Sequence, residues 1–273
     1  MHGDFLFRAL FLFMALTDFQ VFVKGNDAPD ESTNRAATLA QLTKTVESYS
    51  LFIGDKQPES LKLVTPPVLH YSDQISPVTD GLVFAWTKNG RPEAIMALHP
   101  GTQGNTWIEF RSLSLSPLAA TRLGITEWRP RNAGIDFQAF EDAAAPDTTV
   151  AKRLTQMRSM LRDLSASVLD SAKGRQELRL LTQPLFRYSR PEQGILDGAI
   201  FAFVLSTNPE LLLVVEAQVI NDKPQWLYSV ARFTGRKTEL QLKNRTIWPV
   251  TELPSTRDSS APFYQLRALI TDP

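Results

Sequence analysis

The sequence predicts an α+β protein made by tandem duplication of one unit, an N-terminal helix followed by an antiparallel β-meander of about five strands. Three observations predict it. Segments 61–97 and 178–214 align without a gap at an offset of 117 residues and share 12 of 37 positions. An apolar stripe at helical spacing precedes each segment. Within and after each segment, β-rich runs are joined by connections that are too short for parallel crossovers.

The duplication divides the chain into unit 1, residues 37–145, and unit 2, residues 146–273. Beyond the aligned block, Trp107 matches Trp226 and Trp128 matches Trp248 with a small drift in offset. Apolar residues occur on both faces of the central strands, so one face can pack on the helix and the other on the second unit. A pseudo-symmetric pair of units is the leading architecture, and a single merged barrel-like sheet is the alternative.

In unit 1, Asn34 is a plausible N-cap for a helix. The apolar stripe of that helix consists of Leu39, Leu42, Val46 and Tyr49. Strands are expected at 82–88, 94–99 and 106–115, with the first turn at 89–92. The pairs Asp-Gly at 80–81 and Pro-Glu at 92–93 recur at 197–198 and 209–210, and both types of pair are typical of turns or bulges.

In unit 2, Asp147 after Pro146 can cap a helix. Its apolar stripe steps by four and three residues through Val150, Leu154, Met157, Leu161, Leu164 and Val168. Strands are expected at 199–205, 211–218, 225–233, 238–243 and 246–250, each following the previous one after a short turn. This succession predicts one continuous meander.

Composition excludes several classes of function. The 273 residues include 29 basic and 29 acidic side chains, so the chain has no net positive charge that would favour binding to nucleic acid. The chain has no cysteine, which excludes disulfides and thiolate chemistry, and only three histidines. No histidine–carboxylate cluster at ligand spacing and no phosphate-binding loop is present, so we expect no metal and no cofactor.

The N-terminus predicts export. Arg8 precedes a short apolar run at 9–16, as in a secretory signal, and residues 1–25 form the predicted signal peptide. The run is too short for a permanent membrane anchor, so none is expected after processing. Residues 26–36 are polar and predict a linker. The expected location is periplasmic or secreted, with the cytoplasm as the alternative.

Positions that differ between the two units are candidates for a site. His99 aligns with Glu216, Glu109 with Tyr228, and Arg111 with Val230. Glu109 and Arg111 share a strand face, and a neighbouring His99 would complete a polar cleft. A His–Glu pair can act as a general base while an arginine binds an anion. A surface ion pair is the simpler interpretation of the same residues.

A second candidate is basic. Nine basic and three acidic residues lie between Lys152 and Arg190, and Arg158 and Arg162 are one turn apart on the predicted helix 150–172. With Arg187, they form a candidate binding face for an anionic partner. A solvated helix face is the alternative interpretation.

Three runs carry a resemblance to a known family: LRLLTQPLFRY at 178–188, DGAIFAFV at 197–204 and EFRSLS at 109–114. They are similar to a family of uncharacterised, exported proteins of planctomycete bacteria. The resemblance covers most of the chain after residue 36. The family has no established activity, so the resemblance implies export and transfers no catalytic residue.

The sequence therefore predicts an exported, non-catalytic protein that binds a ligand or protein partner, such as an envelope component, at or between its sheets. A hydrolase using His99 and Glu109 is the first alternative. An intracellular scaffold that docks through the basic helix 150–172 is the second.

Overall fold

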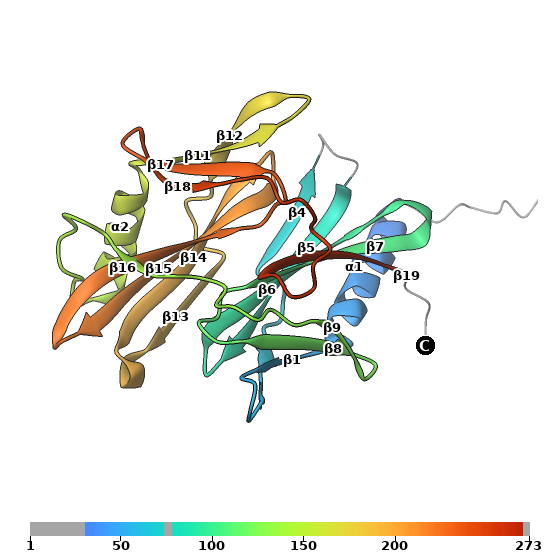
Figure 1. Cartoon of the computed structure of the whole chain (residues 1–273), viewed down its shortest axis with the longest axis horizontal. Coiled ribbons are helices and arrows are strands. Elements are labelled where there is room, and N and C mark those ends of the chain that lie inside the picture. Colours follow the sequence, from blue (N-terminus) through green and yellow to red (C-terminus); the bar gives the residue numbers. More distant parts are fainter. Residues whose placement is uncertain (1–30, 74–77, 270–273) are drawn as a thin grey trace, which may run out of the picture.

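The computed structural model describes residues 31–73 and 78–269, which form a mainly β structure (Figure 1). Strands make up more than half of these residues and assemble into large curled sheets. Two α-helices, α1 (Glu31–Glu47) and α2 (Val150–Leu161), occur in this part of the chain, with the short 3-10 turns η1 (Thr102–Gly104) and η2 (Pro191–Gln193). The predicted α+β class, a duplicated unit of one helix and a five-stranded meander, is therefore wrong.

The first half contains a six-stranded antiparallel sheet with the order β19-β7-β6-β5-β3, in which β4 also pairs with β5. Its strands are β3 (Lys62–Leu63), β4 (Leu69–Asp73), β5 (Val78–Lys88), β6 (Arg91–Pro100), β7 (Asn105–Ser112) and β19 (Phe263–Leu269). The expected hairpins at 82–88, 94–99 and 106–115 are present as β5, β6 and β7. The edge strand β19 comes from near the C-terminal end of the chain.

A four-stranded sheet with the order β2-β1-β8-β9 covers the first half on one side. Its strands are β1 (Tyr49–Ile53), β2 (Glu59–Ser60), β8 (Leu118–Arg122) and β9 (Ile125–Trp128). Together with α1, this sheet packs on one face of β5, β6 and β7, where Phe84, Met96 and Phe110 are fully buried. The chain thus leaves the first sheet after β7 and returns to pair with β1, which a meander does not do.

The second half is one nine-stranded sheet, β10-β16-β15-β14-β12-β11-β17-β18, with β13 on β14. Its strands are β10 (Gln138–Ala139), β11 (Leu164–Asp170), β12 (Gly174–Leu180), β13 (Phe186–Arg190), β14 (Ile195–Leu205), β15 (Asn208–Ile220), β16 (Lys223–Arg232), β17 (Lys237–Leu242) and β18 (Arg245–Val250). After β16 the chain crosses to pair β17 with β11. A short connection therefore joins strands that are not neighbours in the sheet. The prediction of one continuous meander failed here because it assumed that short connections join neighbouring strands.

Both predicted helices have the wrong ends. Residues 31–36, expected as linker, are the first part of α1, and Tyr49 belongs to β1. The apolar stripe of unit 2 continues past the end of α2 at Leu161, because Leu164 and Val168 lie on β11. Two residues that are four apart share a face in a strand as well as in a helix, so this spacing does not separate the two structures. The predicted signal peptide, residues 1–25, lies outside the described residues.

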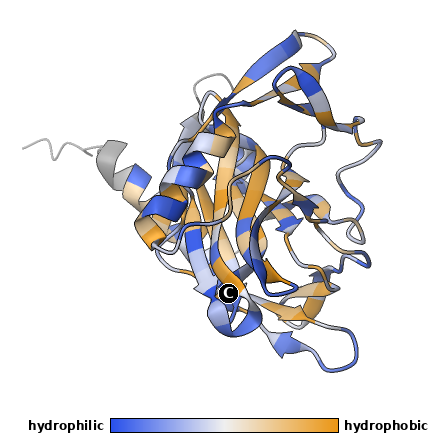
Figure 2. Ribbon diagram, turned by 90° about the vertical axis from the view of Figure 1, so that its left-hand side faces the viewer, coloured by the Kyte–Doolittle hydropathy of each residue, from blue (hydrophilic) through white to orange (hydrophobic). Residues whose placement is uncertain are grey.

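The two halves pack face to face through a third core. Val83 and Ile95 from the first half pack there with Ile200 and Val214 from the second. Figure 2 shows hydrophobic residues concentrated on the strands in the middle of the molecule. The chain between β9 and α2 crosses this junction and adds β10 to the edge of β16, whereas β19 returns to β7. The division into units at residues 145 and 146 stays a prediction, and these two strands cross it.

Candidate functional site

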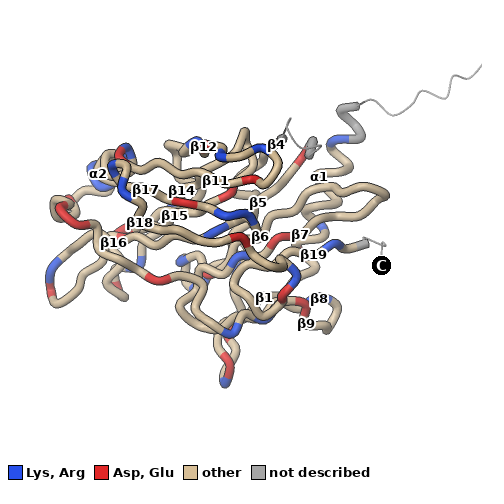
Figure 3. The backbone as a smooth tube through the Cα atoms, turned by 45° about the horizontal axis from the view of Figure 1, so that its top comes forward, with Lys and Arg blue, Asp and Glu red and all other residues tan. Residues whose placement is uncertain are grey.

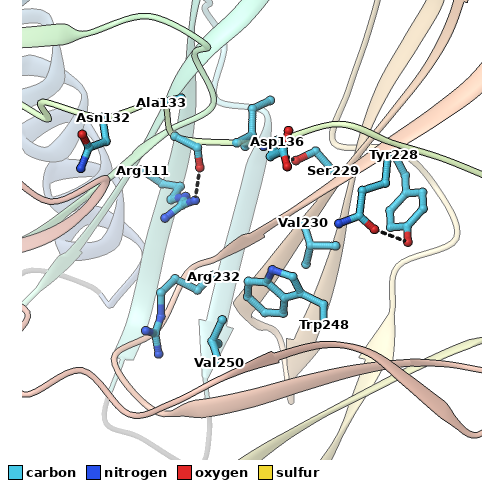
Figure 4. Close-up of a pocket in the computed structure, with 13 residues that line it drawn as sticks. Arg111, Asn132, Ala133, Asp136, Tyr228, Ser229, Val230, Arg232, Trp248 and Val250 are labelled. Carbon is cyan, nitrogen blue, oxygen red and sulfur yellow. Dashed lines mark hydrogen bonds between the residues drawn. The ribbon is translucent and has the colours of Figure 1, made fainter.

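A cavity of about 500 Å³ opens at the junction of the halves. It lies between β7, the segment 132–138 that follows β9, and the strands β16 and β18 (Figure 4). Pockets for small molecules have volumes of roughly 300–1,000 Å³. Arginines, aromatic rings and aliphatic side chains line this cavity, and they come from parts of the chain that are far apart in the sequence.

Arg111 enters the cavity from β7 and is only 7% exposed. Its Nη2 donates a hydrogen bond to the carbonyl oxygen of Gly134, whereas its Nε is buried with no hydrogen-bond partner. Residue 134 must be glycine because a Cβ would lie 2.2 Å from the carbonyl oxygen of Ser112. Burial, together with the nearby charge of Arg232, lowers the pKa of Arg111 to about 9.

Arg232 ends β16 and is 8% exposed. Its Nε donates to the carbonyl oxygen of Thr234 at 2.9 Å, and its Nη2 donates to the carbonyl oxygens of Arg236 at 2.7 Å and Thr251 at 2.9 Å. These bonds fix the guanidinium group without neutralising its charge. Burial lowers the pKa of Arg232 below its ordinary value.

Among the described residues, neither guanidinium group has an acidic partner. Within residues 31–73 and 78–269, no carboxylate oxygen lies within 4.0 Å of Arg111 or Arg232. Buried charges in proteins are normally paired, because removal from water disfavours the charged form. The cavity therefore presents two adjacent, desolvated positive charges whose N–H groups can only donate hydrogen bonds.

Aromatic and aliphatic side chains form much of the remaining lining. Tyr228 and Val230 lie on β16, and Trp248 and Val250 on β18. The Tyr228 hydroxyl donates to Oε1 of Gln138 at 3.0 Å, which fixes the ring. Figure 4 shows the arginines on one side of the cavity, Tyr228 on the other and Trp248 between them. An anion with an apolar body fits this arrangement.

A second cavity of about 330 Å³ lies elsewhere on the junction and contains paired charges. Arg91 contacts Glu216 across the junction, Nε to Oε1, at 3.0 Å, and Glu93 of its own strand, Nη1 to Oε2, at 3.2 Å. The Tyr188 hydroxyl also donates to Glu216 at 2.6 Å. Because the arginine is matched by two carboxylates, we interpret this cluster as an ion-pair bridge between the halves and not as a ligand site.

The sequence predicted that His99, Glu109 and Arg111 lie on one face of the sheet, and the register of β6 and β7 confirms this. His99 lies opposite Trp107, and Ala97 opposite Glu109. The Glu109 carboxylate accepts a hydrogen bond from Nε2 of Gln265. His99 contacts the carbonyl oxygen of Pro100 at 3.1 Å and stacks on Trp107.

The described hydrogen bonds therefore do not join His99 to Glu109, and neither residue lines the two cavities above. Burial raises the pKa of Glu109 to about 7; the Gln265 hydrogen bond opposes this rise, and the charge of Glu210 adds to it. Burial lowers the pKa of His99. Of the three predicted residues, Arg111 alone reaches the 500 Å³ cavity.

The basic candidates do not form one helix face. Arg158 donates to the carbonyl oxygen of Thr182 at 3.1 Å and so fixes the loop after β12. Arg187 lies on β13 and binds Asp197 through Nε at 2.9 Å and Nη2 at 2.6 Å. Arg162 is exposed just beyond α2. The predicted helix 150–172 is wrong beyond Leu161, and Figure 3 shows basic and acidic positions interspersed over both halves.

Sequence reasoning missed Arg232 and Trp248 as site residues. Arg232 aligns with Leu113 at the offset of 119, so the comparison of the two segments could have flagged it as it flagged Arg111. Trp248 was interpreted only as a position shared with Trp128. Trp128 is fully buried, whereas Trp248 is half-buried against the cavity.

The described residues contain no group of three or more histidine, cysteine, aspartate or glutamate side chains that could hold a metal ion. None of the helices in the described ranges is long and apolar enough to cross a membrane. Comparison of the chain with protein-family models, with curated proteins and with solved structures gives no match. The site must therefore be interpreted from its own geometry.

Proposed function

We propose that this chain is a non-catalytic binding protein that holds a small, anion-bearing molecule in the cavity between β7, β16 and β18. The observation that carries the proposal is the pair Arg111 and Arg232, two buried guanidinium groups without a carboxylate partner in the described part of the chain. An anion offsets the cost of keeping both groups charged away from water. It also accepts from those N–H groups of Arg111 that no described hydrogen bond occupies.

The effect of removing Arg111 on stability distinguishes a binding role for this residue from a structural one. A buried arginine that holds a fold together is normally paired, so its removal destabilises the protein by about 3–5 kcal/mol. Arg111 instead binds one carbonyl oxygen and faces a second positive charge. Replacing it with methionine, which has a similar volume, should leave the ligand-free protein at least as stable.

The test is thermal unfolding in acetate or sulfate, each compared with chloride at equal ionic strength. We expect both anions to raise the unfolding temperature of the wild type, since a ligand that binds only the folded state stabilises it. Arg111→Met should weaken this effect about tenfold in anion concentration, equivalent to about 1.4 kcal/mol. Arg162→Met removes the same charge from an exposed position and is the control. Equal responses of Arg111→Met and wild type would refute the proposal.

We also propose export, on the signal-like run after Arg8. Cell fractionation combined with intact mass tests it directly. A chain that lacks about 25 N-terminal residues and lies outside the cytoplasm supports export. A full-length cytoplasmic chain contradicts it and would favour an intracellular ligand.

A further inference from the structure

The size of the cavity says more about the ligand than the arginines do. A water molecule occupies about 30 Å³ of liquid, and an inorganic anion only a few times that volume. Such an ion would leave most of a 500 Å³ cavity empty. If the arginines bind an anionic group, as the proposed function has it, the remainder of the cavity has room for a covalently attached body.

The walls specify the chemistry of that body. Tyr228 and Val230 are each 9% exposed, and they are continuous with the core under α2. Trp248 and Val250 are half-buried and face them from β18. Rings and branched aliphatic side chains form an apolar wall, and aromatic groups bury much apolar surface when they pack against other rings.

Charge is distributed unevenly along the cavity. Arg111 and Arg232 lie at one side, whereas Asp136 lies near Ser229 and Tyr228 at the other (Figure 4). The backbone N–H of Asp136 donates to Oγ of Ser229 at 3.2 Å, which holds this acidic residue at the cavity edge. A second anionic group at that end of a ligand would meet a like charge, so a single negative charge fits best.

The free donors select the anionic group. The described hydrogen bonds occupy Nη2 of Arg111, and Nε and Nη2 of Arg232. The Nε of Arg111 is buried out of reach, so a ligand in the cavity meets the terminal nitrogens of this guanidinium group. A planar carboxylate can accept two parallel hydrogen bonds from the edge of a guanidinium group, which is the geometry that arginine favours.

We propose that the ligand is a monocarboxylate with a flat aromatic body, its carboxylate at Arg111 and Arg232 and its rings against Trp248, Val230 and Val250. This inference rests on the proposed function, because it assumes that the arginines bind an anion. It goes further by assigning the apolar half of the ligand and its single charge.

The test ranks three probes by isothermal titration on the wild-type chain: 2-naphthoate, its neutral analogue 2-naphthylmethanol, and acetate. We expect 2-naphthoate to bind at least tenfold more tightly than either of the others. Equal affinity for acetate would overturn the aromatic body while leaving the anion site intact. Equal affinity for 2-naphthylmethanol, or no binding of 2-naphthoate, would overturn the inference, and the Arg111→Met experiment would then judge the proposed function separately.

Two variants place the probe. Trp248→Leu should weaken 2-naphthoate at least fivefold and leave acetate unchanged, whereas Arg111→Met should weaken both. Val250→Asp adds a charge beside the proposed rings and should also weaken 2-naphthoate, which provides a second reading if Trp248→Leu does not fold. Arg158→Met, whose arginine fixes a loop away from the cavity, is the control. Unchanged affinity in folded Trp248→Leu and Val250→Asp would refute the placement.

Discussion

Tyr71 and Tyr188 each place a ring over a glycine of the neighbouring strand. A Cβ on Gly81 would lie 2.3 Å from Cζ of Tyr71, and a Cβ on Gly198 would lie 2.4 Å from the Tyr188 ring. The sequence pattern indicated turns or bulges at both Asp-Gly pairs, and the register does shift just after each tyrosine. The glycines themselves are inside β5 and β14, where the absence of a side chain makes room for a ring.

Glu109 should make the stability of the fold depend on pH. Its folded pKa is about 7, above the ordinary value of 4.5, because burial disfavours the carboxylate. Between these two values the folded state binds more protons than the unfolded state, so stability falls as pH rises and the full cost is present above pH 7. Glu109→Gln removes the charge and keeps an oxygen that can accept from Gln265.

We expect Glu109→Gln to be more stable than wild type by about 1–3 kcal/mol at pH 8 and equal to it near pH 4. Urea unfolding at the two pH values measures the difference. Glu177→Gln, on an exposed part of β12, is a matched control and should show no such dependence. A Glu109→Gln variant that is less stable at pH 8 would contradict this prediction and show that the carboxylate stabilises the fold.

At the scale of elements, β6 and β15 are joined by Arg91 and Glu216. Glu216 is fully buried and accepts from Arg91, Tyr188 and Gln218. Arg91→Met leaves that carboxylate without its cation and should cost about 3–5 kcal/mol. The double variant Arg91→Met with Glu216→Gln removes both charges and should cost less than the sum of the single changes.

A double-mutant cycle measured by urea unfolding gives the coupling between the two residues. We expect at least 1 kcal/mol of coupling energy, because the ion pair spans the junction away from solvent. Additive single changes would mean that Arg91 and Glu216 act separately, and the interpretation of this cluster as a bridge would fail. Lys88 and Glu59, an exposed pair at 2.7 Å, provide the comparison and should couple weakly.

The long hairpins were predictable because short turn signals separate strongly apolar runs, as at 89–92 between β5 and β6. The partners of β8 and β17 were not predictable in this way. Neither strand pairs with the strand that precedes it in the sequence. Instead, β8 pairs with β1 and β17 pairs with β11, which both lie much earlier in the sequence. Which distant strand has a free edge depends on the whole fold, and turn chemistry does not encode it.

For the whole molecule, contacts between distant parts of the sequence also limited how much of the site could be predicted. Arg111 was predicted as a site residue because it differs from Val230, the residue aligned with it in unit 2. In the structure, both residues line the same cavity. Its partners Arg232 and Trp248 lie more than a hundred residues away in the sequence. A comparison of one segment with the other cannot show that both line one space. The site exists only where the two halves meet, so it required the structure.

The C-terminal strand β19 should be essential to the first half. It pairs with β7 from Phe263 opposite Arg111 to Leu269 opposite Asn105, and Phe263 is buried beside Phe233 of the second half. A chain that ends at Pro262 would lose that ring, at a cost of about 3–5 kcal/mol, and would expose the edge of β7. It would also leave Arg111 beside an open edge, so acetate binding should be lost with the fold of the cavity.

Urea unfolding and gel filtration should show a less stable, self-associating protein, and a peptide of residues 260–269 should restore the monomer. The matched control ends at Leu269 and should behave as the full chain. If the shorter chain were equally stable and monomeric, the first half would be complete without β19.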